Sequence, residues 1–203
     1  MGLKTVVKVS HITDLATARY CAGIGVDMIG FCLDDYSADF LQAKTAQEIA
    51  SWVAGVQIVG EISSATPVHI SDYPLSMLEL NSAVLLKKFV EEDALHSNAP
   101  LIYRFSIDNL ETLALCYEAL SEQVPNVVYF LLESSLLKID AQVSSLLAKL
   151  CNEYPILLGF GITQDNILTI LEQIKPKGIA IRGTIDSLAA ILEQIEIEDN
   201  IEM

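Results

Sequence analysis

Two residues whose side chains could move protons stand where apolar runs of the sequence end. Ser10 ends the first run, and Glu133 ends the run that begins at Val127. A carboxyl group held neutral by burial can act as a general acid. A serine hydroxyl is far less acidic than a thiol and needs a partner base before it can act. Both are therefore candidate catalytic residues, with simple packing of Ser10 and capping or solvation of Glu133 as the alternatives.

Glycines, a threonine and an arginine after the last two apolar runs could hold a phosphate. The candidates are Gly159, Gly161, Thr163, Arg182 and Gly183. Backbone N–H groups near a helix N-terminus bind phosphate, and a guanidinium can grip it with two parallel hydrogen bonds. Gly159-x-Gly161 lacks the third glycine of a dinucleotide fingerprint, and Arg182 could instead pair with one of the many acidic residues. Phe160 places a ring where bare backbone would approach the anion, so a weak site is expected.

Lys8 is a further candidate for binding substrate. It lies two residues before Ser10, so the two side chains share one face of a strand. A lysine that points into a protein interior needs a carboxylate partner or a function. Arg104, near the end of another apolar run, is a second candidate cation. His11 directly follows Ser10 and is expected on the opposite face of the strand, where it would not reach Ser10.

Eight short apolar runs must position these side chains, and such runs are typical of parallel strands covered on both faces. They are Thr5–Ser10, Asp27–Cys32, Gln57–Glu61, Ser76–Asn81, Leu101–Ser106, Val127–Glu133, Ile156–Gly161 and Gly178–Arg182. Helical patterns lie between most of them, with candidate N-caps at Asp14, Thr45, Asp108, Asp140, Thr163 and Asp186. Eight such units predict a single-domain (β/α)₈ barrel over residues 1–203, and an open doubly wound sheet is the alternative.

The third unit and the tail depart from this pattern. Between Glu61 and Leu75 there is little room for a helix, and Pro67 and Pro74 interrupt it. We therefore expect the third helix to be short or missing. Residues 197–203 are acidic, and we expect them to fray.

Composition limits the classes of partner. The net charge of −15, with 12 lysines and arginines together, argues against nucleic acid or an anionic membrane as partner. No apolar run reaches the length of a membrane span, and the start of the chain lacks the features of a signal peptide. Cys21, Cys32, Cys116 and Cys151 show no disulfide or metal-type spacing. These features predict a cytoplasmic protein with reduced cysteines and no bound metal.

Several segments resemble phosphoribosylanthranilate isomerase, a barrel enzyme of tryptophan biosynthesis. The opening of that family resembles residues 8–14, KVSHITD, followed by residues 25–31, GVDMIGF. The similarity continues at residues 37–40, 131–133, 155–166 and 178–183, and so covers nearly the whole chain. The resemblance implies a (β/α)₈ barrel that opens the ribose ring of a phosphosugar and moves a proton from C2. It implies no cofactor, and a homodimer is compatible with it.

The residues of the active site match the family less well than the scaffold does. Ser10 stands where the family has the cysteine that acts as general base, and His11 replaces the glycine that follows it. Glu133 stands where the family has the aspartate that acts as general acid. Asp39 replaces an arginine of the loop after the second strand, and Glu79 replaces a glutamine.

Two functions stay open on this basis. One is a slow isomerase of the tryptophan pathway that uses Glu133 and a base not yet recognised. The other is a barrel that kept its fold and a site for a small anion or sugar while losing catalysis. Loss of a general base lowers the rate by about 10² to 10⁴-fold, so we expect weak or no activity.

Overall fold

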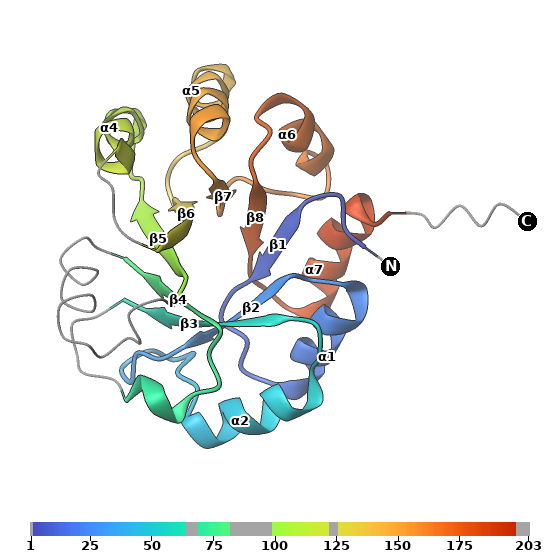
Figure 1. Ribbon diagram of the computed structural model, residues 1–203. Coiled ribbons are helices and arrows are strands. Elements are labelled where there is room, and N and C mark those ends of the chain that lie inside the picture. The colour runs from blue at the N-terminus through green and yellow to red at the C-terminus, as the bar shows by residue number, and fades with distance from the viewer. Residues whose placement is uncertain (1, 64–68, 82–98, 122–125, 198–203) are drawn as a thin grey trace, which may run out of the picture.

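Eight parallel strands form a closed barrel in chain order (Figure 1). This computed structural model describes residues 2–63, 69–81, 99–121 and 126–197. The strands are β1 (Val6–Val9), β2 (Met28–Cys32), β3 (Gln57–Ile62), β4 (Met77–Leu80), β5 (Leu101–Ser106), β6 (Val127–Glu133), β7 (Ile156–Leu158) and β8 (Gly178–Ile181). β8 pairs with β1 from Val6↔Gly178 to Val9↔Ile181 and so closes the barrel. The predicted barrel is confirmed, and the open sheet is wrong.

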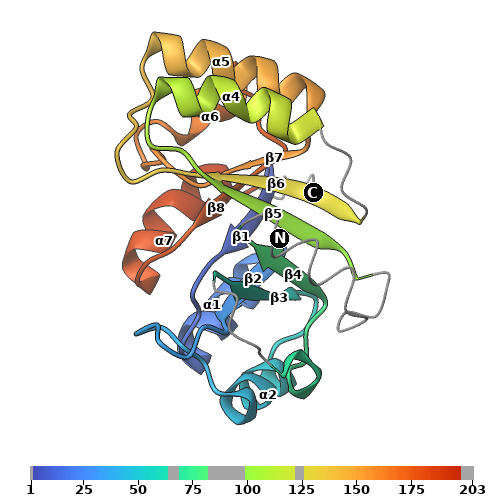
Figure 2. The ribbon, with the colours of Figure 1, turned by 90° about the vertical axis from the view of Figure 1, so that its left-hand side faces the viewer.

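Helices surround the strands. They are α1 (Leu15–Ile24), α2 (Ala43–Trp52), α4 (Leu110–Ser121), α5 (Ala141–Glu153), α6 (Ile167–Gln173) and α7 (Ile185–Leu192). Figure 2 shows α4, α5 and α6 on one side of the strands and α1 and α2 on the other. No helix in these described ranges is long and apolar enough to span a membrane.

Two of the predicted helix caps are confirmed. The Asp14 carboxylate accepts a hydrogen bond from the Thr17 N–H at the start of α1, and Asp140 accepts from the N–H groups of Gln142 and Val143 at the start of α5. The other four predictions are wrong by one to three residues. The N-caps lie at Gln42, Asn166 and Thr184 for α2, α6 and α7, and Asn109 accepts from the Thr112 N–H at the start of α4.

The connection between β3 and β4 is reduced, as predicted. Its described part contains a single 3₁₀ turn, η1 (Ile70–Asp72), and no α-helix. Residues 64–68 and most of the acidic tail lie outside the described ranges. Within the tail, the Ile197 N–H donates to the Gly2 carbonyl oxygen at 2.8 Å.

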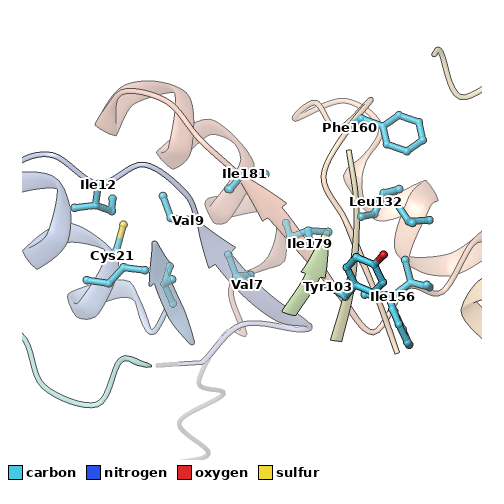
Figure 3. Packing of buried hydrophobic residues seen from close by; sticks show 14 of the residues in the cluster. Val7, Val9, Ile12, Cys21, Tyr103, Leu132, Ile156, Phe160, Ile179 and Ile181 are labelled. Carbon is cyan, nitrogen blue, oxygen red and sulfur yellow. The ribbon is translucent and has the colours of Figure 1, made fainter. Parts of the chain in front are cut away.

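Two apolar clusters hold the fold together. The larger one lies between the strands and the surrounding helices and includes Val7, Val9, Leu132, Ile156 and Ile179 (Figure 3). The smaller one fills the barrel with side chains from seven strands: Met28, Val59, Met77, Ile102, Leu131, Leu157 and Ala180. Alternate residues of each strand point to opposite faces, so residues two positions farther along the strands continue the interior toward the carboxyl ends. Charged residues occupy that upper part.

The cysteines are buried structural thiols. Cys21, Cys32 and Cys116 are buried and Cys151 is partly buried, and none forms a disulfide. Burial raises the pKa of the Cys21 and Cys151 thiols to about 12. A thiol with so high a pKa stays protonated at neutral pH, so neither residue is a ready nucleophile.

Candidate functional site

Lys8 is the central residue of a buried charge network inside the barrel. Its side chain is 0% exposed and forms ion pairs with Glu61 of β3 and Glu79 of β4. The distance from Lys8 Nζ to Glu79 Oε2 is 2.7 Å, and Nζ also donates a hydrogen bond of 2.6 Å to Ser10 Oγ. The prediction that Lys8 binds substrate is therefore corrected, because its ammonium group is surrounded by protein groups and has no exposure to a ligand.

The strand register and one glycine create the space for this network. Glu61 and Glu79 are direct partners in the pairing of β3 with β4, so their side chains lie next to one another inside the barrel. Gly30 of β2 faces the same space, and a Cβ atom there would overlap the Glu61 carboxylate. A residue with any side chain at position 30 would thus displace the Glu61 group that binds Lys8.

Burial and the surrounding charges shift the pKa values of these groups in different directions. Burial acts to lower the pKa of Lys8, but Glu61 and Glu79 outweigh it and the pKa is raised. Burial acts to raise the pKa of Glu61, yet Lys8 and His11 outweigh it and the pKa is lowered. For Glu79, burial and the neighbouring Glu61 prevail over Lys8 and Arg104, so its pKa is raised. Lys8 is consequently held charged, and Glu79 takes up a proton more readily than Glu61.

Arg104 extends the network to the mouth of the barrel. Its Nη1 atom lies 3.3 Å from Glu79 Oε1 and 3.5 Å from Glu133 Oε2, and its Nη2 donates to Ser63 Oγ. The candidate cation Arg104 is thus paired inside the protein. The Glu133 side chain is 35% exposed, so the expected burial of this carboxyl group is not found.

His11 lies at the mouth of the barrel, against the expectation from strand alternation. β1 ends at Val9, and His11 has a φ of 57°, a left-handed conformation uncommon for a residue other than glycine. Its backbone N–H donates to Glu61 Oε2 at 3.1 Å, and its ring Nδ1 lies 2.7 Å from Asp39 Oδ2. Strand alternation does not apply beyond the strand end. Asp39 is therefore paired with a histidine and is not an isolated negative charge.

A cavity of about 200 Å³ lies at the carboxyl ends of β6, β7, β8 and β1. Five of the eight predicted site residues line it: Ser10, Glu133, Gly159, Gly161 and Arg182. The remaining lining residues are Phe160, Ile162, Ala180, Ile181 and Ile191. Lys8, Thr163 and Gly183 are not among them. The sequence thus located the cavity from the chain positions of its strand ends, as the barrel fold requires.

The loops around this cavity depend on backbone conformation. Gly161 has a φ of 68°, and a Cβ atom there would lie 2.8 Å from Ile139 Cδ1. The Thr163 N–H donates to Asn166 Oδ1, and Asn166 Nδ2 donates to the Gly161 carbonyl oxygen, so these bonds hold the loop closed on itself. Phe160 is 4% exposed and its ring belongs to the hydrophobic core (Figure 3), so the expected obstruction by a ring projecting from the loop is not found.

Comparison with known proteins identifies the fold. No protein-family model and no curated protein sequence matches the chain. Among solved structures, phosphoribosylanthranilate isomerase from Thermus thermophilus superposes with a TM-score of 0.73 at 17% identity, over 93% of this chain and 97% of that one. The enzyme from Thermotoga maritima gives a TM-score of 0.72 at 17% identity, over 94% and 98% of the two chains. This chain has the phosphoribosylanthranilate isomerase fold.

The phosphoribosylanthranilate isomerase fold accounts for the position of the cavity but not for the charges beside it. Glu61 was missed as a site residue, although a lysine predicted to point inward implied a carboxylate partner or a function. The contact between His11 and Asp39 was also missed, because 28 positions separate them in sequence. The sequence did offer one signal for this contact, because both residues differ from the isomerase family: His11 replaces a glycine and Asp39 replaces an arginine.

The chemistry of the cavity is constrained by the hydrogen bond on Ser10. A serine acts as a base or nucleophile only when a partner accepts its proton. The nearest candidate, Lys8, donates to Ser10 Oγ and is held charged by two carboxyl groups. Ser10 can therefore position or exclude a ligand group, but no hydrogen bond to another of the described residues gives it an acceptor for its proton.

Proposed function

We propose that this barrel is a phosphoribosylanthranilate isomerase-like protein that binds a small phosphosugar and isomerises phosphoribosylanthranilate slowly. Its turnover is at least about a hundredfold below that of an ordinary isomerase, the minimum effect of losing the general base at position 10. Glu133 is the proposed proton donor, because it is the carboxyl group among the described residues that line the cavity. The observation that carries the proposal is the 2.6 Å hydrogen bond from Lys8 Nζ to Ser10 Oγ, which removes Ser10 as a base.

The lining of the cavity supports a phosphorylated ligand. Arg182 can pair with a phosphate, and Gly159 and Gly161 let the backbone approach it. One solved phosphoribosylanthranilate isomerase with 18% identity and a TM-score of 0.71 is in complex with a reduced carboxyphenylamino-deoxyribulose 5-phosphate. The cavity volume of about 200 Å³ is below the roughly 300 Å³ at which ligand pockets usually begin, which favours a small ligand bound weakly.

A barrel that binds a small anion or sugar without catalysis is the second candidate. Two observations favour it. Ser10 Oγ already accepts a hydrogen bond from Lys8, and Glu133 is partly exposed, so neither residue has the surroundings expected of a proton-transfer group. Residence in the cytoplasm and association as a homodimer belong to the proposal as well, and size-exclusion chromatography coupled to light scattering tests the dimer.

The deciding experiment combines two measurements on the purified chain. The first is kcat/KM for phosphoribosylanthranilate, beside growth of a tryptophan auxotroph that carries this coding sequence. The second is titration with ribose 5-phosphate at physiological salt. Slow turnover with weak binding supports the isomerase-like protein, and binding without turnover supports the second candidate. Absence of both contradicts the proposed ligand class.

A further inference from the structure

Two departures from the isomerase pattern are in direct contact. His11 stands where the family has a glycine, and Asp39 stands where it has an arginine. In the structure, His11 Nδ1 lies 2.7 Å from Asp39 Oδ2. Taken singly, one change adds a bulky ring to a tight turn and the other reverses a charge. Taken together, they make a histidine oriented by a carboxylate.

The backbone holds the histidine ring at the mouth of the barrel. The φ of 57° at His11 turns the chain away from the strand direction, and the bond from its N–H to Glu61 Oε2 fixes the turn. Strained conformations of residues other than glycine persist where surrounding contacts determine them, and they cluster at functional sites. Glu61 is itself held in place by its ion pair with Lys8, so the residue that binds the His11 backbone has a fixed position.

The second ring nitrogen of His11 is left for a ligand. Nε2 lies 3.6 Å from Glu61 Oε2, which is too long for a hydrogen bond, and within the described residues no other polar atom bonds to it. A carboxylate on one ring nitrogen selects the tautomer that leaves the other nitrogen as an acceptor. The ring is 22% exposed. His11 is not among the described residues that line the cavity, but the preceding residue, Ser10, is, so the ring lies at the edge of the cavity.

We propose that His11 is the general base of the slow isomerisation and that Asp39 is its positioning residue. The assignment rests on the proposed function. After Glu133 gives a proton to the ring oxygen, the ribose opens to an iminium at C1. Nε2 of His11 takes the proton from C2, the C2–H electrons form a C1=C2 bond, and the C1=N electrons return to nitrogen. His11 then gives this proton to C1, and the C2 hydroxyl gives its own proton to Glu133, so both groups return to their starting states. The product is the amino-ketone, and no further reactant is consumed.

Several charged groups lie near His11, and each of them can affect how kcat/KM depends on pH. Asp39 approaches from the loop after β2, and Glu61 approaches from β3 with Lys8 and Glu79 behind it. Asp34, in the same loop as Asp39, accepts a hydrogen bond from the Ser63 N–H. Histidine side chains in general change charge between about pH 5 and 8, so kcat/KM is to be measured across this range.

The test compares His11→Asn with His69→Asn. Asparagine tolerates the left-handed conformation, so the backbone turn at position 11 is kept. His69 is an exposed histidine before η1, and its replacement is the matched control. We expect His11→Asn to lower kcat/KM by about 10²-fold or more and to change the dependence of kcat/KM on pH. Its affinity for ribose 5-phosphate and its unfolding midpoint should stay close to those of His69→Asn.

Two further measurements separate positioning from packing. Asp39→Asn should lower kcat with little change in KM, and Asp39→Glu should recover part of the loss. Long-range ¹H–¹⁵N NMR of the ring should show the proton on Nδ1 in the wild type and a changed tautomer population in Asp39→Asn. A His11→Asn variant as active as the wild type overturns the proposal, and so does an unchanged pH profile. A wild type that binds ribose 5-phosphate without turnover also overturns it and leaves the ligand class standing.

Discussion

Glu61 and Glu79 are register partners on neighbouring strands and share one fully buried lysine, Lys8. Two carboxyl groups side by side around a single ammonium cannot both ionise at low energy, and the pKa directions show how they differ. Removal of one partner from a buried ion pair destabilises a protein because it leaves an unpaired buried charge. The network therefore makes stability depend on which carboxyl group is removed.

The first prediction concerns the two glutamates as a pair. Glu61→Gln should lower the free energy of unfolding more than Glu79→Gln, because Glu61 carries the charge that balances Lys8. The double variant should lose about 3–5 kcal/mol or more, since Lys8 is then buried without any anion. Urea unfolding at pH 7 measures all three variants. Additive effects of the two single changes would show that the carboxyl groups do not share Lys8.

The second prediction is the dependence of stability on pH. Glu79 has a raised pKa in the folded protein, so the folded state binds its proton more tightly than the unfolded state does. The unfolding free energy should therefore fall as the pH rises from 4.5, the ordinary value of the group, through the folded pKa. Glu61 has a lowered pKa, and its contribution is present above 4.5 and is lost as the pH falls through its folded value. Urea unfolding from pH 4 to 8 should show that Glu79→Gln gains on the wild type as the pH rises. A constant difference would contradict the assignment.

The third prediction tests the space beside Glu61. Gly30→Ala should destabilise the protein strongly, by about 3 kcal/mol or more, because the new methyl group would displace the carboxylate that holds Lys8. Gly23→Ala is the control, since a Cβ atom there meets nothing within 4 Å and the residue lies in α1. That change should stabilise by about 0.5–1 kcal/mol, as expected for glycine to alanine in a helix. Thermal unfolding of both variants measures these effects. Equal shifts of the two unfolding midpoints would mean that the Glu61 side chain moves aside without loss of stability.

The fourth prediction concerns the residue at the position of the family's base. Ser10→Cys should give no large gain in kcat/KM for phosphoribosylanthranilate. The Lys8 ammonium at 2.6 Å from the side-chain atom of residue 10 would bind a thiolate rather than leave it free to take a proton. A gain of about a hundredfold would show that loss of the base was the main defect and that the rest of the site survives.

The fifth prediction concerns phosphate. Ribose 5-phosphate should bind weakly at physiological salt. Arg182 is the only cationic side chain among the described residues that line the cavity, and the Glu133 carboxyl group in the same lining disfavours an anion. Arg182→Ala should weaken the binding further, and isothermal titration calorimetry measures both. Lys138→Ala serves as a control that removes a positive charge from a residue that does not line the cavity. Sub-micromolar affinity of the wild type would contradict the prediction.

The sequence alone determined the barrel and the place of its cavity. The eight apolar runs are strands in the structure, and Asp14 and Asp140 cap helices as predicted. Ser10, Glu133, Gly159, Gly161 and Arg182 meet at one cavity although they are far apart in sequence. The physical reason is that a closed parallel barrel brings every strand's carboxyl end to the same face. A residue at the carboxyl end of a strand can therefore be placed at the mouth of the barrel from sequence alone.

Only the tertiary structure decided what each polar side chain does there. The partners of Lys8 depend on the register of β3 and β4, which sets Glu61 beside Glu79. The orientation of His11 depends on a left-handed backbone conformation, and its contact with Asp39 joins a strand end to a separate loop. Such contacts arise from small differences in distance between non-neighbouring segments. The spacing of apolar residues does not predict these contacts, because a single backbone turn or a shift of one residue in register changes which side chains meet.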